Sequence, residues 1–124
     1  MAWEISHSPI SWILVRANLR AWRKGWLVSA LCDVQYIEAE RADTEYDQDT
    51  YKSTIIGLDT ETLVDLCLDA IEKHNTCSNG GHEFYIDPEG YHTVPVSLTD
   101  EAKELLTDEE RVEIEVYAPE ELEL

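Results

Sequence analysis

Four carboxylates alternate with other residues in the polar segment 38–54: Asp43, Glu45, Asp47 and Asp49. If the segment is extended, alternate side chains share one face and lie about 6.6 Å apart, at about 3.3 Å per residue. Nucleic acid also presents regular negative charge, with one phosphate for about every 3.4 Å of axis on each strand. The series therefore predicts a surface that a basic protein could bind in place of nucleic acid. A solvated acidic loop is the alternative interpretation.

The spacing of these carboxylates also resembles that of a calcium-binding loop, but two required residues are missing. Gln48 stands where an EF-hand loop needs glycine, and Thr54 stands where its closing glutamate belongs. We therefore do not predict a calcium site in this segment.

Four soft or borderline metal ligands lie near two expected turns: His74, Cys77, His82 and His92. A single Zn²⁺ could use such a set, but the spacing matches no familiar zinc module. Structural histidines are commoner than histidines that bind metal. We predict no bound metal and no cofactor, and a metal-binding domain built on these four residues stays as an alternative function.

The sequence lacks the motifs of common catalytic sites. It has no Gly-x-Ser-x-Gly turn, no glycine-rich phosphate loop and no His-Glu-x-x-His pair. Cys77, near His74 and His82, is the one Cys/His combination worth naming. A reactive thiol needs an electropositive setting to lower its pKa, and this half of the chain is heavily acidic. We predict that the protein is not an enzyme.

The charge of the 124-residue chain is large and uneven. The net charge is −18. Residues 1–37 carry four cations and two acids, whereas residues 38–124 carry five cations and 25 acids. Direct binding of nucleic acid is disfavoured, because phosphates repel carboxylates. Such a field is suited to a basic protein surface, although acidity that only keeps the protein in solution is an open alternative.

Three helices are predicted in the first part of the chain. Ser8 and Pro9 suit a helix start, and apolar residues follow at helical spacing up to Gly25, a plausible end. A second helix fits residues 26–37, and a third, with Asp59 or Thr60 as its cap, fits residues 60–74. We expect residues 38–54 to form an acidic loop or a frayed helix extension.

Two groups of side chains in this part invite a structural interpretation. The tryptophans are expected in the core, as are two cysteines that lie in apolar helical patterns. The cations are expected to pair with the protein's own acids, with docking of an acidic partner or of a second copy as the alternative. The residues are Trp3, Trp12, Trp22 and Trp26; Cys32 and Cys67; and Arg16, Arg20, Arg23 and Lys24.

The last third of the chain predicts a hairpin, a short helix and a strand. Residues 82–86 and 91–96 are rich in strand formers, and Asp87 to Gly90 between them fit a type I turn. Thr99 is expected to cap a helix over 100–106. Apolar and acidic residues alternate over 112–116, which indicates a third strand, and residues 118–124 are expected to fray.

Together these elements predict a single α+β domain over residues 1–124. Its N-terminal half has two or three helices, and a small antiparallel sheet of two to four strands follows. The start of the chain lacks the basic and apolar regions of a signal peptide, and cations interrupt the apolar segments. Three cysteines without a framework spacing suit a reducing compartment. We therefore expect a cytoplasmic protein without a membrane partner, either a monomer or a homodimer.

The size, charge and acidic runs of the chain resemble those of small inhibitors made by phages and mobile elements. The runs are Asp43 to Asp49, Asp108 to Glu110, and Glu120 with Glu121. Anti-CRISPR and anti-restriction proteins belong to this group, and several are similar to DNA in their charge display. The resemblance implies an inhibitor that occupies the nucleic-acid channel of a bacterial defence complex. The basic N-terminal segment departs from a uniformly acidic mimic.

The leading hypothesis is therefore an acidic protein-binding inhibitor whose partner is the basic surface of a nucleic-acid-handling protein complex. A small housekeeping or structural domain, with acidity that serves only solvation, is the alternative. The predicted partner-binding residues are Glu38, Glu40, Asp43, Glu45, Asp47 and Asp49, followed by Asp108, Glu109 and Glu110.

Overall fold

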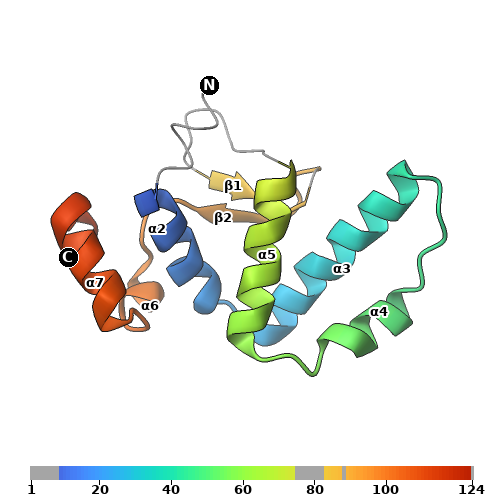
Figure 1. Cartoon of the computed structure of the whole chain (residues 1–124), viewed down its shortest axis with the longest axis horizontal. Helices are drawn as coiled ribbons and strands as arrows, with labels where there is room; N and C mark the ends of the chain where they lie inside the picture. The colour runs from blue at the N-terminus through green and yellow to red at the C-terminus, as the bar shows by residue number, and fades with distance from the viewer. Residues whose placement is uncertain (1–8, 75–82, 88, 124) are drawn as a thin grey trace.

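A computed structural model of the chain describes residues 9–74, 83–87 and 89–123 (Figure 1). The predicted α+β class is confirmed, because helices dominate and a small antiparallel sheet accompanies them. The elements in chain order are α2 (Pro9–Arg20), α3 (Lys24–Arg41), α4 (Gln48–Ile55), α5 (Thr60–His74), β1 (Glu83–Tyr85), β2 (Thr93–Pro95), α6 (Asp100–Lys103), α7 (Asp108–Tyr117) and the 3₁₀ helix η1 (Pro119–Leu122).

The larger apolar core lies between α2, α3, α5 and the hairpin. The helix predicted over 60–74 is confirmed as α5, and its whole apolar stripe is buried. Cys32 and Cys67 are buried, as predicted. Burial raises the pKa of the Cys67 thiol to about 12, so this cysteine is an inert core residue. The stripe consists of Leu63, Val64, Cys67, Leu68 and Ile71.

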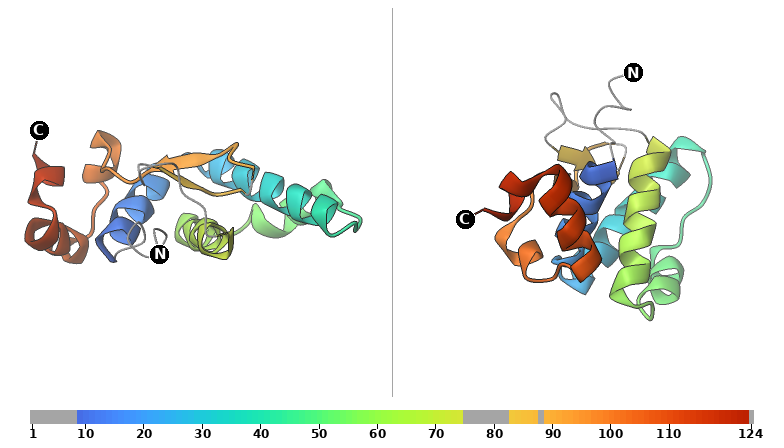
Figure 2. Two further views of the ribbon diagram at one scale, coloured as in Figure 1. Left: turned by 90° about the horizontal axis from the view of Figure 1, so that it is seen from above. Right: turned by 60° about the vertical axis from the view of Figure 1, so that its left-hand side comes forward.

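A second, smaller core covers the opposite side of α2. Leu14 and Ala17 of α2 pack there against Leu98, Ala102 and Ile114. Figure 2 shows the C-terminal helices beside α2 on this side, away from α5. Helix α2 is thus covered on two sides, since Val15 and Leu19 belong to the larger core.

The C-terminal segment is folded, so the expectation that residues 118–124 fray is wrong for the described residues 118–123. Pro119–Leu122 form the helix η1, and Leu122 packs against the second core. The Glu121 carboxylate accepts a 2.8 Å hydrogen bond from the backbone N–H of Leu98. This contact joins the end of the chain to the segment between β2 and α6, which local sequence cannot reveal.

The first two helices break earlier than expected. The predicted end at Gly25 is wrong, because α2 ends at Arg20 and Gly25 lies in the first turn of α3. Two i→i+3 hydrogen bonds tighten the end of α2, and Arg23 then takes an extended conformation with φ −62° and ψ 143°. The predicted second helix is confirmed, and it continues to Arg41. Residues 38–54 were expected to be a loop or a frayed helix extension, which is wrong from Gln48 onward, because residues 48–55 form the separate helix α4. The capping role predicted for Ser8 lies outside the described residues.

The predicted strand over 112–116 is wrong, because these residues lie in α7. Thr107 accepts from the backbone N–H of Glu110 at 3.1 Å, and the Glu110 carboxylate accepts from the N–H of Thr107 at 2.9 Å. This reciprocal capping box starts a helix. Ile114 then faces the second core while Val112 and Val116 point to solvent. An alternating pattern over five residues does not separate a strand from such a helix.

The hairpin is confirmed as β1 and β2. The strands pair antiparallel with Phe84 opposite Val94, and both side chains are fully buried. The backbone N–H of Gly90 donates to the carbonyl of Asp87 at 3.2 Å, the bond that closes the predicted turn. Gly90 has φ +80°, a conformation that suits glycine. The helix expected over 100–106 is shorter and ends at Lys103, with Thr99 as its cap.

The tryptophans divide between core and surface. Trp12 and Trp22 are partly buried against the larger core, as expected. Trp26 is 56% exposed, so the core interpretation is wrong for this residue. Trp3 lies outside the described residues. Within the described part of the chain, no helix has both the length and the apolar character needed to cross a membrane.

Arg20 connects α2 to two other helices. Its guanidinium makes a bidentate contact with Glu110 of α7, at 2.7 and 3.1 Å, and donates to Glu61 of α5 at 2.6 Å. It also donates to the Leu105 carbonyl at 3.0 Å. The Arg20 and Glu110 side chains are only 14% and 13% exposed. Burial alone would raise the pKa of the Glu110 carboxyl, but the bonds from Arg20 and Thr107 outweigh it and hold that pKa below its ordinary value.

We predict that Arg20→Met lowers the free energy of unfolding by about 3 kcal/mol, because it leaves the Glu110 carboxylate largely buried without its partner. Arg41→Met is the control, since its 3.4 Å pair with Glu89 is exposed and should contribute less than about 1 kcal/mol. Urea unfolding at neutral pH measures both. A loss in Arg20→Met no larger than in the control would contradict the bridging role of Arg20.

Candidate functional site

Most cations of the described chain are engaged by the protein's own acids or backbone. Arg16 donates to Asp65 at 2.6 Å, and Arg20 binds Glu61 and Glu110. The intramolecular pairing expected for the basic N-terminal stripe is therefore confirmed for these two arginines. Arg23 and Lys24 are exposed and form no ion pair with any residue that the structure describes. Further pairs join Lys73 to Glu38, Arg41 to Glu89 and Lys103 to Asp100.

The α3–α4 acidic surface consists of Glu40, Asp43, Glu45, Asp47 and Asp49, all exposed. The segment does not form the extended series that the alternation suggested. Asp43 has φ +55°, and Asp49 lies in the first turn of α4. The direction of the backbone changes at both ends of the loop, so the four alternating carboxylates do not follow one straight edge.

Asp47 has a structural role in this surface. Its carboxylate caps α4 by accepting from the Thr50 backbone N–H at 3.2 Å and from the Thr50 hydroxyl at 2.8 Å. These bonds hold the pKa of Asp47 below its ordinary value. Glu38 is also engaged, with its carboxylate 2.9 Å from the Lys73 ammonium. The carboxylates of this surface that form no ion pair with described residues are Glu40, Asp43, Glu45 and Asp49.

Tyrosines hold the acidic loop against α3. The Tyr46 hydroxyl donates to the Cys32 carbonyl at 3.1 Å, and its ring lies between those of Tyr36 and Tyr51, with centroids 6.2 and 6.3 Å away. Burial is the main cause that raises the pKa of Tyr46, so this hydroxyl stays a donor at neutral pH. The loop therefore presents its carboxylates from a fixed position.

The α6–α7 acidic surface lies on the C-terminal helices. Glu110 is left out of it because Arg20 and Thr107 engage its carboxylate. The other two predicted residues on α7, Asp108 and Glu109, are exposed. The surface consists of the exposed residues Glu101, Glu104, Asp108, Glu109, Glu113, Glu115 and Glu120.

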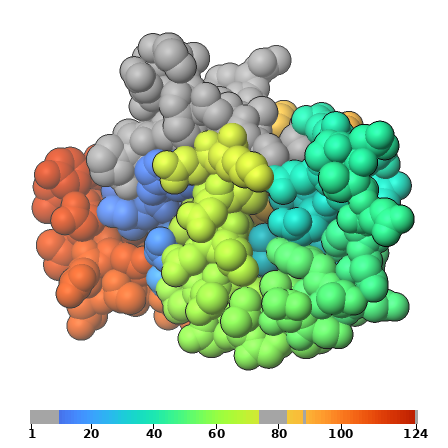
Figure 3. Space-filling model, turned by 45° about the vertical axis from the view of Figure 1, so that its right-hand side comes forward, coloured from blue at the N-terminus to red at the C-terminus, as the bar shows by residue number. Residues whose placement is uncertain are grey.

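The two acidic surfaces lie at opposite ends of the molecule. Figures 1 and 2 place α7 at one end of the longest axis and the loop between α3 and α4 at the other. Helix α5 lies between them, and Figure 3 shows all three regions on one face. The exposed side of α5 adds Asp69 and Glu72, whereas Asp65 is paired with Arg16. The nine predicted partner-binding residues thus form two separated groups with acidic residues of α5 between them.

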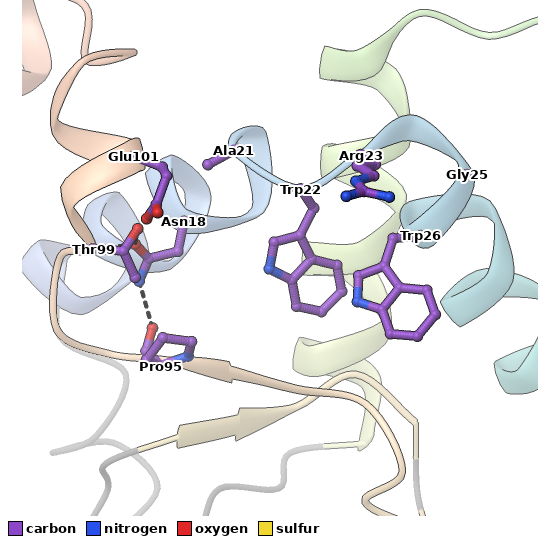
Figure 4. A pocket seen from close by; sticks show the side chains of 9 residues that line it. All are labelled: Asn18, Ala21, Trp22, Arg23, Gly25, Trp26, Pro95, Thr99 and Glu101. Carbon is purple, nitrogen blue, oxygen red and sulfur yellow. Dashed lines mark hydrogen bonds between the residues drawn. The ribbon is translucent and has the colours of Figure 1, made fainter.

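An open groove with a volume of about 860 Å³ lies between the α2–α3 turn, β2 and the start of α6. Figure 4 shows the indoles of Trp22 and Trp26 side by side, across the groove from Thr99 and Glu101. Its lining is mostly apolar, with Arg23 beside the two indoles and the exposed Glu101 at the opposite wall. Such a groove can accept an aromatic or aliphatic side chain, or a cationic one through contact with an indole face.

Asn18 fixes the wall opposite the two indoles. Its amide donates to the carbonyls of Pro95 and Ser97 at 2.8 and 2.9 Å, and its carbonyl accepts from Thr99. The spacing of Trp22 and Trp26 was the available sequence signal, but it was interpreted as packing. Only the break after α2 turns these rings toward the groove.

His92 lies beside this groove and is held by two carboxylates. Its ring nitrogens are 3.3 Å from Asp87 and 3.5 Å from Asp33, and its ring makes an edge contact with Trp26 at 5.9 Å between centroids. The side chains of His74, Cys77 and His82, the other members of the alternative metal set, lie outside the described residues. Among the described residues, no group of three or more His, Cys, Asp or Glu side chains is placed to hold a metal.

The chain was compared with protein-family models, with curated protein sequences and with solved structures, and none of them matches.

We predict that Asp87→Asn destabilises the hairpin and the groove wall that depends on it. The fully buried Asp87 carboxylate accepts from the backbone N–H groups of Glu89, Tyr91 and His92. Burial alone would raise the pKa of Asp87, but these bonds and the His92 ring outweigh it and lower that pKa. The expected loss at neutral pH is about 2 kcal/mol.

This loss should depend on pH. A carboxyl whose folded pKa is lowered stabilises the fold above its unfolded pKa, and the contribution disappears as the pH falls through the folded value. Urea unfolding of wild type and Asp87→Asn should therefore converge as the pH falls below about 4 towards the lowered folded pKa of Asp87. Asp69→Asn, an exposed position, is the control with no expected loss. A difference between wild type and Asp87→Asn that stays constant over this range would contradict the role of the Asp87 charge.

Proposed function

We propose that this chain is an acidic protein-binding domain that occupies a basic surface on a nucleic-acid-handling protein complex and so excludes nucleic acid from it. The proposal rests on which charged side chains are paired within the protein and which are not. The cations Arg16 and Arg20 are engaged inside the molecule, whereas most carboxylates of the α3–α4 and α6–α7 acidic surfaces have no ion pair with described residues. The field that a partner meets is therefore strongly negative.

The placement of these carboxylates favours an elongated binding surface on the partner. The two acidic surfaces lie at opposite ends of the longest axis, and acids of α5 lie between them. A partner that contacts both ends must present basic residues over a comparable length, as a channel for a nucleic-acid strand does. The irregular path of residues 43–49 gives no copy of the phosphate spacing. Binding would then depend on overall charge and shape, and not on carboxylates spaced like the phosphates of nucleic acid.

Charge should act mainly on the rate of association and on the choice of partner. Complementary potentials steer encounter and discriminate against acidic surfaces. Salt screens exposed charges, so complex formation should weaken as ionic strength rises. The folded state itself should become more stable as ionic strength rises, because screening reduces the self-repulsion of a chain with a net charge of −18.

We predict that the chain displaces DNA from a basic partner and that Asp43→Asn/Glu45→Gln weakens the displacement about tenfold. Asn suits position 43, where φ is +55°, so the variant should keep its fold. Purified CRISPR effector complexes and restriction enzymes, each bound to fluorescent DNA, provide the test by anisotropy at low and moderate salt. Glu83→Gln/Glu89→Gln removes the same charge from the hairpin and should displace DNA almost as well as wild type.

Two results would contradict this proposal. In one, DNA stays bound in every complex tested, which would favour a structural domain whose acidity serves only solvation. In the other, both double variants lose activity equally, which would show that total charge matters and that the α3–α4 acidic surface does not.

A further inference from the structure

Helix α7 exposes apolar side chains on the face that points away from the rest of the protein. Val112 and Val116 are 57% and 64% exposed. The two valines are four residues apart and so lie on one side of the helix, while Ile114 is buried on the other. The fold does not require valine at these positions, because they contribute nothing to either core and β-branched residues are modest helix formers.

Exposed carboxylates flank the two valines on both sides. At 3.6 residues per turn, Glu109 and Glu113 lie along one edge of the valine stripe, and Asp108 and Glu115 lie along the other. The outer face of α7 thus combines an apolar centre with an acidic rim. Protein interfaces commonly have this arrangement of an apolar core and a polar rim.

The scaffold holds α7 in place before any partner arrives. The capping box at Thr107 starts the helix, the bidentate contact between Arg20 and Glu110 ties it to α2, and Ile114 is fully buried. Arg111 adds a 3.2 Å bond to the Lys103 carbonyl. A helix that is already ordered loses little conformational freedom when it docks, so the apolar contact contributes more of its free energy to binding.

Charge complementarity decides which occupant suits this face. A second copy of the chain would bring two rims of carboxylates together, and each copy carries a net charge of −18. An anionic membrane would repel the same rim. A protein groove with an apolar floor and a rim of lysine and arginine would satisfy both the valines and the carboxylates.

We infer that α7 is a recognition helix that docks, through Val112, Val116 and the carboxylates beside them, into an apolar groove rimmed by basic residues on the partner. The inference rests on the proposed function and names the surface on which the partner's specificity depends. It assigns direct apolar contact to α7, whereas the α3–α4 acidic surface acts through charge.

Two synthetic peptides of about 14 residues test this inference with the full chain. One is a helical Lys/Leu peptide with an apolar face, and the other replaces each leucine by serine and keeps the charge. We expect the Lys/Leu peptide to bind more tightly, and its amide shift changes in the ¹⁵N-labelled chain to concentrate in residues 108–117. Val112→Thr/Val116→Thr, which keeps shape and charge, should weaken the Lys/Leu peptide about tenfold and change the Lys/Ser peptide by less than about twofold.

Glu109→Gln/Glu113→Gln is the matched variant on the same helix. It removes charge and should weaken both peptides. All four mutated side chains are exposed, so thermal unfolding of each variant should stay close to that of wild type.

Equal binding of the two peptides, or shift changes centred on the α3–α4 acidic surface, would overturn the docking role of α7 and leave the proposed function standing. Failure of both peptides to bind would also overturn it. The DNA-displacement assay judges the proposed function separately, because it depends on Asp43 and Glu45 and not on the valines.

Discussion

The structure depends on one helix that is buried on two sides. Helix α2 contributes Val15 and Leu19 to the larger core and Leu14 and Ala17 to the smaller one. Both cores therefore rest on the same twelve residues. Polar contacts follow the same arrangement, since Arg20 binds acids of α5 and α7, and Asn18 holds the segment from Pro95 to Thr99. The C-terminal helices, which are strongly acidic, pack on the domain through these contacts with α2. Their position at one end of the molecule follows from the way α2 is packed.

The same connection shapes the electrostatic character of the surface. A chain with nine cations and 27 acids has little positive charge to distribute. Where Arg16 and Arg20 are used between helices, they neutralise Glu61, Asp65 and Glu110 and remove positive charge from the exterior. Of these pairs, that of Arg20 with Glu110 is largely shielded from water and stabilises the fold, and the carboxylates without such a partner are left exposed. The same ion pairs stabilise the fold and leave the exterior negative, so a substitution of Arg20 would affect both.

The sequence predicted the elements whose signals are local. Helix α5 has a regular apolar stripe, and the hairpin has a turn whose Gly90 adopts φ +80°. Other local signals were present and were given too little weight: Thr107 with Glu110, and Asp47 with Thr50, are capping pairs that start α7 and α4. The remaining features depend on partners far away in the chain. Glu121 meets Leu98, and Arg20 meets Glu110, so neither the folded C-terminal segment nor the loss of Glu110 from the acidic surface could be read from its neighbours.

The error at residues 112–116 carries a physical lesson about exposed surfaces. In a strand the valines and Ile114 would share one face, and their apolar character would be explained by burial. In the observed helix they lie on opposite sides, so burial explains Ile114 and leaves Val112 and Val116 without a structural reason. Acidity alone can draw the chain toward any basic surface, because long-range electrostatic attraction depends little on the shape of the partner. Apolar contacts act only at short range and require a fitted groove. The partner would therefore be attracted by the carboxylates of the whole molecule and selected by the small apolar stripe on α7.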